Sequence, residues 1–105
     1  MESFALTEAV YYVLLSLYTP LHGYGIMQKT ESMSNGRVRL AAGTLYGAIS
    51  TMLEKGWIQA VAGELYSRKK EYVITKLGKN IAEQELARLQ ELVFNGENIV
   101  KERLL

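Results

Sequence analysis

The stretch from Gly43 to Ile58, GTLYGAISTMLEKGWI, constrains the fold most, because its apolar residues recur at helical spacing. The apolar face comprises Leu45, Ile49 and Leu53, with Ala48 and Met52 beside them. The opposite face is small, polar and almost uncharged, and consists of Thr44, Tyr46, Gly47, Ser50 and Thr51, with Lys55 at its end. Such a face suits a DNA groove, where hydroxyls reach phosphates and base edges. Packing against another helix explains this stretch alone equally well.

The composition narrows the class of protein. A chain of 105 residues forms one domain, and a hydrophobic share of 49% favours burial of some apolar surface against a partner. The chain has no cysteine and a single histidine, His22, so we expect neither disulfides nor a metal site, and no cofactor. The start, MESFALTE, lacks a secretory pattern, and the apolar run 9–18 is too short to span a bilayer. We expect a cytoplasmic protein without a membrane partner.

Charge is distributed unevenly along the chain, although the net charge is only +1. Residues 29–79 contain nine Lys or Arg against four Glu, whereas the segments before and after are each acidic by two charges. The middle of the chain could therefore face phosphates. An excess this small could also arise by chance.

Two helices are predicted ahead of the central one. The first begins after Thr7, a suitable N-cap, and ends before Thr19 and Pro20. The second follows HGYG and ends in a turn at residues 34–36. Gly23 and Gly25 favour close helix packing and a tight bend, and we expect His22 to make a structural hydrogen bond more readily than a phosphate contact. A helix joined to the central helix by the connector 37–43 is typical of a helix-turn-helix.

A β-hairpin is predicted after the central helix. Strand patterns run from Trp57 to Val61 and from Glu71 to Ile74, and the densest basic cluster of the chain lies between them. This cluster comprises Arg68, Lys69 and Lys70. A hairpin in this position is a wing, whose basic tip contacts the DNA backbone or minor groove. The alternative is a solvated edge strand protected from aggregation by its lysines.

The chain ends in a long amphipathic helix capped by Thr75. Its predicted inward residues are Leu77, Ile81, Ala82, Leu86, Leu89, Val93 and Val100. This stripe is longer than so small a domain can cover, so we expect dimerisation through Leu86, Leu89, Val93 and Val100. Asn95 and Gly96 could kink or end the helix. The predicted fold class is α+β, mostly α, with a winged helix-turn-helix at 1–75 and a dimerisation helix at 76–105.

A small apolar ligand could lie between the first and last helices. The residues that would surround it are Tyr11, Leu86, Leu89 and Phe94. Helix interfaces of this kind form such pockets, although residues of these types more often build a simple core. The existence of an effector therefore stays open at this point.

The sequence resembles the PadR family of bacterial transcriptional regulators in its short form with one C-terminal helix. The resemblance rests on LTEAVYYVLLSL, HGYGIMQ, GTLYGAISTMLEKGWI and RKKEYVITKLGK. It implies a homodimeric winged helix-turn-helix repressor that releases DNA when a small molecule binds. Many relatives have Ser-Pro where this chain has Ala41 and Ala42, so Thr44 could take over as N-cap. Some relatives stack ligands on a tryptophan where this chain has Leu89, which argues against that mode of sensing.

We therefore predict a homodimeric DNA-binding regulator that recognises a palindromic operator with half-sites about 10 base pairs apart. The DNA contacts are assigned to Thr44, Tyr46, Gly47, Ser50, Thr51, Lys55, Arg68, Lys69 and Lys70. The alternative is a winged-helix protein-interaction module without sequence-specific DNA binding. An enzyme fits poorly, because one histidine, no cysteine, no aspartate and scattered glutamates provide no catalytic set.

Overall fold

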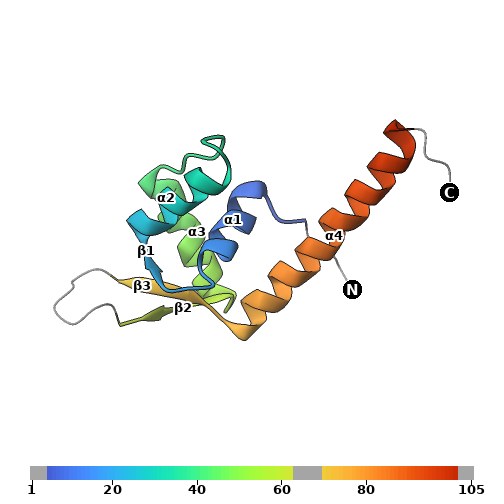
Figure 1. The fold of residues 1–105 in the computed structure, drawn as a ribbon. Coiled ribbons are helices and arrows are strands. Elements are labelled where there is room, and N and C mark those ends of the chain that lie inside the picture. The colour runs from blue at the N-terminus through green and yellow to red at the C-terminus, as the bar shows by residue number, and fades with distance from the viewer. Residues whose placement is uncertain (1–4, 63–69, 102–105) are drawn as a thin grey trace.

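The computed structural model describes residues 5–62 and 70–101. Four helices and three short strands follow one another along the chain (Figure 1). They are α1 (Glu8–Ser16), β1 (Leu21–His22), α2 (Gly23–Met33), α3 (Ala42–Glu54), β2 (Ile58–Val61), β3 (Glu71–Ile74) and α4 (Lys76–Val100). The fold is mostly helical with a small antiparallel sheet, as the sequence predicts.

The helix caps largely follow the sequence. The Thr7 side chain accepts a hydrogen bond from the backbone N–H of Val10 at 3.1 Å, which confirms Thr7 as the N-cap of α1. α1 ends at Ser16, before Thr19 and Pro20 are reached. α2 ends in the predicted turn, where Asn35 and Gly36 both have positive φ angles, of 53° and 81°.

The strand β1 was not predicted. Its two residues pair with β3, so that Leu21 lies opposite Tyr72 and His22 opposite Glu71. His22, the last residue of β1, is also the N-cap of α2, because its Nδ1 atom accepts a hydrogen bond from the N–H of Gly25 at 3.1 Å. The structural role expected of His22 is confirmed, and it joins the sheet to the second helix.

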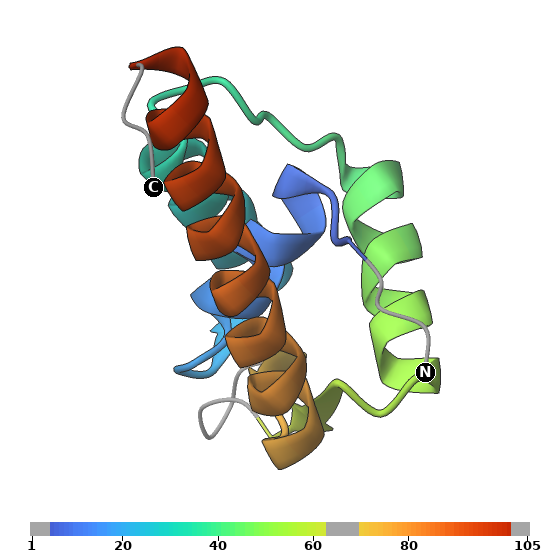
Figure 2. The same ribbon diagram turned by 90° about the vertical axis from the view of Figure 1, so that its right-hand side faces the viewer.

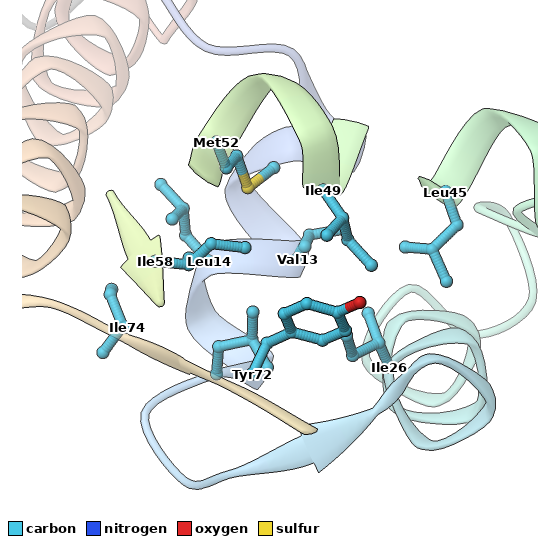
Figure 3. Close-up of a cluster of buried hydrophobic side chains, with 10 residues drawn as sticks. Val13, Leu14, Ile26, Leu45, Ile49, Met52, Ile58, Tyr72 and Ile74 are labelled. Carbon is cyan, nitrogen blue, oxygen red and sulfur yellow. The ribbon is translucent and has the colours of Figure 1, made fainter. Parts of the chain in front are cut away.

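The core lies between the first three helices and the sheet (Figure 3). It includes Val13, Leu14 and Leu17, then Ile26 of α2, Leu45, Ile49 and Met52 of α3, and Ile58, Tyr72 and Ile74 of the sheet. α3 therefore buries most of its predicted apolar face. Leu53 is the exception at 38% exposed, because it lies near the end of α3 and on its edge.

The three strands form one sheet in the order β1-β3-β2. β2 and β3 pair antiparallel, with Ile58 opposite Ile74 and Val61 opposite Glu71. Tyr72 and Ile74 point into the core, and alternate with the half-buried Glu71 and Val73. This hairpin follows α3 as a wing, and its tip, with Arg68 and Lys69, lies outside the described residues.

The start of α4 is tied to the end of α3. Thr75 caps α4 by accepting from the Gly78 N–H at 3.1 Å, and its own hydroxyl donates to the carbonyl of Gly56 at 2.6 Å. The Thr75 N–H also donates to the Trp57 carbonyl at 2.9 Å. From this joint α4 passes alongside α1, on which it packs (Figure 2), and its C-terminal part extends beyond the other elements (Figure 1). It is helical through Asn95 and Gly96 to Val100, so these two residues do not end it.

Candidate nucleic-acid interface

The outer face of α3 is uncovered within the described part of the chain. Its predicted DNA-contacting residues are all exposed, namely Thr44, Tyr46, Gly47, Ser50, Thr51 and Lys55. Among the described residues outside its own helix turn, no atom lies within 4 Å of the position that a Cβ on Gly47 would occupy, so another backbone can approach closely there. The Tyr46 ring of this face contacts the beginning of α2, while the hydroxyl residues and Lys55 stay exposed.

The beginning of α3 differs from the prediction. The helix starts at Ala42 with Ala41 as its N-cap, and no side chain caps it. Thr44 does not replace the missing cap, because it already lies inside the first turn, whereas a capping side chain must come from the residue that precedes the helix. Thr44 is left as an exposed hydroxyl close to that end of the helix.

Tyr46 is the one large side chain on this face. It is 49% exposed, yet its ring lies against Gly23 at the beginning of α2. A Cβ on Gly23 would lie only 2.9 Å from Cζ of Tyr46. The close packing expected of Gly23 is therefore confirmed, and its partner is a residue predicted to contact DNA.

The basic residues near α3 differ in their partners. Arg37 pairs with Glu8 at 2.7 Å and Arg39 with Glu31 at 2.9 Å. The Nζ atom of Lys55 instead lies 5.4 Å from the centre of the Trp57 ring. Lys55 is exposed, and so is Lys70, which immediately precedes β3. Exposed lysines such as these two attract a polyanion toward the exposed face of α3.

The apolar stripe of α4 faces away from the domain over most of its length. Leu77, Leu86, Val93 and Val100 are exposed, Val100 at 82%. The expectation that Leu77 points inward is wrong, whereas Leu86, Val93 and Val100 belong to the part of the stripe that the domain was not expected to cover. The residues that α4 buries are Gly78, Ala82 and Glu85, while Ile81 and Leu89 are half-buried. Phe94 is 53% exposed on the same helix. Exposed apolar side chains that follow one another along a helix indicate an interaction site.

A buried ion pair lies where α4 meets α1, and the sequence reasoning missed it. Glu85 is 3% exposed and receives two hydrogen bonds from Arg88, from Nε at 2.8 Å and from Nη2 at 2.6 Å. These bonds lower the pKa of Glu85, burial opposes them, and the backbone N–H of Leu6 adds to the lowering. Helical spacing places Glu85 on the same face as Gly78, Ala82 and Leu89, and this pattern could have predicted its burial. A glutamate, however, is seldom assigned to a buried face.

A cavity of about 260 Å³ adjoins this ion pair between α1 and α4. Tyr11 and Leu89 line it, as predicted for a ligand site, whereas Leu86 and Phe94 do not line it and are exposed. Burial raises the pKa of Tyr11, and the nearby Glu85 carboxylate adds to the rise. Glu85 and Arg88 also line the cavity, so charged groups lie beside its apolar residues, which the sequence did not predict.

Comparison with known proteins decides the family. The sequence profile of the PadR-like family of transcriptional regulators matches residues 12–84. The chain belongs to the PadR-like family. Membership makes it a DNA-binding transcription regulator and not an enzyme. No curated protein matches it in sequence.

Solved structures share the fold of this PadR-like chain. A transcriptional regulator from Clostridium thermocellum is 22% identical, with 89% of each chain covered and a TM-score of 0.66. A PadR family regulator from Eggerthella lenta is also 22% identical, with 87% of this chain and 80% of that chain covered and a TM-score of 0.71. A PadR-like regulator from Bacillus cereus is 19% identical, with 89% of each covered and a TM-score of 0.71.

The described residues of the PadR-like chain hold neither a metal cluster nor a membrane-spanning helix. Within residues 5–62 and 70–101, no group of three His, Cys, Asp or Glu side chains is placed to hold a metal ion. No helix among the same residues is long and apolar enough to cross a membrane.

A second cavity, which was not anticipated, lies between α1 and α3. It has a volume of about 350 Å³ and an apolar lining, to which Leu6, Val10, Met52 and Trp57 contribute. Thr51 and Lys55, two of the predicted DNA contacts of this PadR-like chain, lie at the same cavity.

Proposed function

We propose that the protein is a homodimeric repressor that inserts α3 of each subunit into the major groove of a palindromic operator. The observation that carries this proposal is the exposed face of α3, which is polar and almost uncharged and whose small hydroxyl residues Thr44, Ser50 and Thr51 are all exposed. An α-helix fits the major groove, and short hydroxyl side chains allow its backbone to come near the base edges.

The residues of the interface divide into two roles. Ser50 and Thr51 lie on the exposed side of α3 and would read base edges, while Gly47 allows close approach and Thr44 and Tyr46 would contact phosphates or bases. Lys55 and Lys70, together with Arg68 and Lys69 of the wing, would bind phosphates. The first group would then set specificity and the second would set affinity on every sequence.

Dimerisation would use α4. Leu86, Val93 and Val100 present exposed apolar side chains along this helix, and Leu89 lies half-buried beside them. A second copy of the chain would cover this surface and, by two-fold symmetry, place the two α3 helices at successive turns of the duplex, about 10 base pairs apart. Residues 1–75 would thus bind DNA, and residues 76–105 would hold the dimer together.

Release from DNA would follow binding of a small apolar effector between α1 and α4. Tyr11 and Leu89 already line a cavity there. Leu86 and Phe94 are exposed on the same helix, so a second copy packing on α4 would also meet them. An effector that separates or tilts the two α4 helices would change the spacing of the α3 helices and so weaken operator binding.

The alternative function is a winged-helix module that binds protein and not specific DNA. Fluorescence anisotropy with labelled duplexes, titrated from low to high salt, separates the two. We expect saturable binding that weakens steeply with salt, with a preference for one duplex over its scrambled version. Absence of binding at low salt would favour the interaction module.

The wing is tested in the same assay by the Lys69→Ala/Lys70→Ala variant. If both lysines contact phosphates, the variant binds all duplexes more weakly, and its logarithmic salt slope is shallower by about four, which is about two for each subunit of the dimer. An unchanged slope would remove the wing from the mechanism.

A further inference from the structure

The junction between β1 and α2 holds the side chain of Tyr46. Gly23, the first residue of α2, is buried, and the Tyr46 ring occupies the space where any other residue would carry its side chain. A Cβ on Gly23 would lie 2.9 Å from Cζ and 3.4 Å from Cε1 of Tyr46, and nearer still to the phenolic oxygen. The end of the Tyr46 side chain is therefore in direct contact with the backbone of α2.

The backbone at Gly23 is fixed from both sides. His22, its neighbour, pairs with Glu71 in the sheet, and the His22 side chain accepts a hydrogen bond from the Gly25 N–H at 3.1 Å. Gly23 thus cannot move without disturbing a strand pair or a helix cap. The Tyr46 ring therefore contacts a stretch of backbone that the sheet and the cap of α2 both hold in place.

The Tyr46 side chain has room to move. It is 49% exposed, and the adjoining Gly47 has no neighbour outside its own helix turn within 4 Å of a Cβ position among the described residues. Contact with the Gly23 backbone is a restraint on this ring that the structure shows directly. A methyl group at position 23 would occupy the place of the phenol and displace the ring toward solvent.

We propose that Gly23 is a positioning residue for DNA binding, which holds the phenol of Tyr46 in one orientation on the DNA-facing side of α3. The inference rests on the proposed function and names a residue that need not touch DNA itself. A side chain that is already ordered loses less conformational entropy when it binds, so the contact strengthens binding without adding an interaction.

Gly23→Ala separates this role from a role in folding. No left-handed backbone angle requires glycine at this position, and alanine is the better helix former. The side chain in the way is the far end of a half-exposed tyrosine, which can swing into solvent. We expect the variant to keep the thermal stability of the wild type and to lose the fixed position of the ring.

The test is a double-mutant cycle measured by anisotropy, on a duplex selected from a random library by the wild-type protein. Gly23→Ala should weaken binding roughly three- to tenfold for each half-site, which is the range expected for releasing one ordered side chain, and so about ten- to a hundredfold for the dimer. In a Tyr46→Ala background the same substitution should have no effect. The matched control is Gly25→Ala, on the same turn of α2, where the nearest atom to the new methyl is a Leu21 carbon at 3.3 Å.

The outcomes are distinguishable from those of the proposed function. Failure of the wild type to select any duplex would contradict the proposed function, and with it the DNA role of Gly23. Selection by the wild type, with equal affinity of Gly23→Ala or an equal loss in both backgrounds, would overturn the positioning role alone. NMR adds a direct readout, since cross-peaks between the Gly23 α protons and the Tyr46 ring must be present in the wild type.

Discussion

Helices α3 and α4 are both amphipathic, but α3 leaves its polar face exposed, whereas α4 leaves its apolar face exposed. α3 buries Leu45, Ile49 and Met52 in the core of its own chain and presents small polar residues outside. α4 buries Gly78, Ala82 and Glu85 against the domain and presents Leu86, Val93 and Val100 outside. The uncovered face indicates the partner: a hydrated polyanion for α3 and an apolar surface for α4.

The largest effect is expected from placing charge on the exposed face of α4. Leu86→Glu/Val93→Glu would bury four unpaired carboxylates in a dimer interface, two from each chain, which costs more than about 4 kcal/mol, or roughly 1,000-fold in self-association. Sedimentation velocity at micromolar concentration should then show a monomer. The matched control, Asn80→Asp/Gln84→Glu, adds the same charge at exposed polar positions on another face of the helix and should leave the dimer intact. Equal dissociation of both variants would contradict a specific interface.

A smaller effect should come from the buried face of α4. A Cβ on Gly78 would overlap the carbonyl of Trp57 and lie 2.6 Å from a side-chain carbon of Ile74, and the Trp57 backbone cannot swing aside. Gly78→Ala should therefore lower the free energy of unfolding by about 2–3 kcal/mol in chemical denaturation at fixed protein concentration. Gly96→Ala, in the same helix but without neighbours within 4 Å, should be neutral or stabilising. Similar losses in both variants would mean that helix propensity, not packing, decides.

The Glu85–Arg88 pair predicts a pH dependence. The pKa of Glu85 is lowered by Arg88, so its contribution to stability is present above the ordinary glutamate pKa of about 4.3 and is lost as pH falls below it. Glu85→Gln should cost about 1.5 kcal/mol at pH 7 and flatten the fall in stability between pH 5 and 3. Denaturation curves recorded from pH 7 down to pH 3 measure both the cost at pH 7 and the fall in stability in acid. Glu83→Gln, at an exposed position of the same helix, should retain the wild-type pH profile, and an unchanged profile for Glu85→Gln would exclude the pair as its source.

The smallest effect belongs to the polar face of α3. Ser50→Ala should change the preference for one base pair by about 1 kcal/mol, roughly fivefold, and leave binding to unrelated duplexes unchanged. Lys55→Ala should weaken all duplexes alike, because it removes a phosphate contact. Competition against duplexes with single base-pair changes distinguishes the two patterns. Uniform losses in Ser50→Ala would rule out base reading at this position.

The same contrast explains what the sequence could predict. The caps at Thr7 and Thr75 and the apolar face of α3 are local patterns, because the residues that make each of them are neighbours along one helix. β1 carries no such pattern, since its two residues gain their hydrogen bonds only from β3, far along the chain. Thr44 was misplaced as a cap because two alanines left the start of α3 unmarked.

Two features of the candidate site depend on contacts between distant segments. The ion pair of Glu85 with Arg88 is local, but the burial of Glu85 follows from the packing of α4 near α1 and from the approach of Leu6, which lies far from Glu85 in the sequence. The contact of Tyr46 with Gly23 joins α3 to the start of α2, and only the folded chain shows which side chain fills the space above that glycine. The exposed residues of α3 were predictable because they share one face of a single helix.

Sedimentation equilibrium of the protein with its selected duplex tests most directly the claim that α3 and α4 serve different partners. The account predicts two chains per duplex for the wild type, and a monomer that binds the same duplex far more weakly for Leu86→Glu/Val93→Glu. One chain per duplex, with the same affinity in the wild type and in this variant, would contradict it.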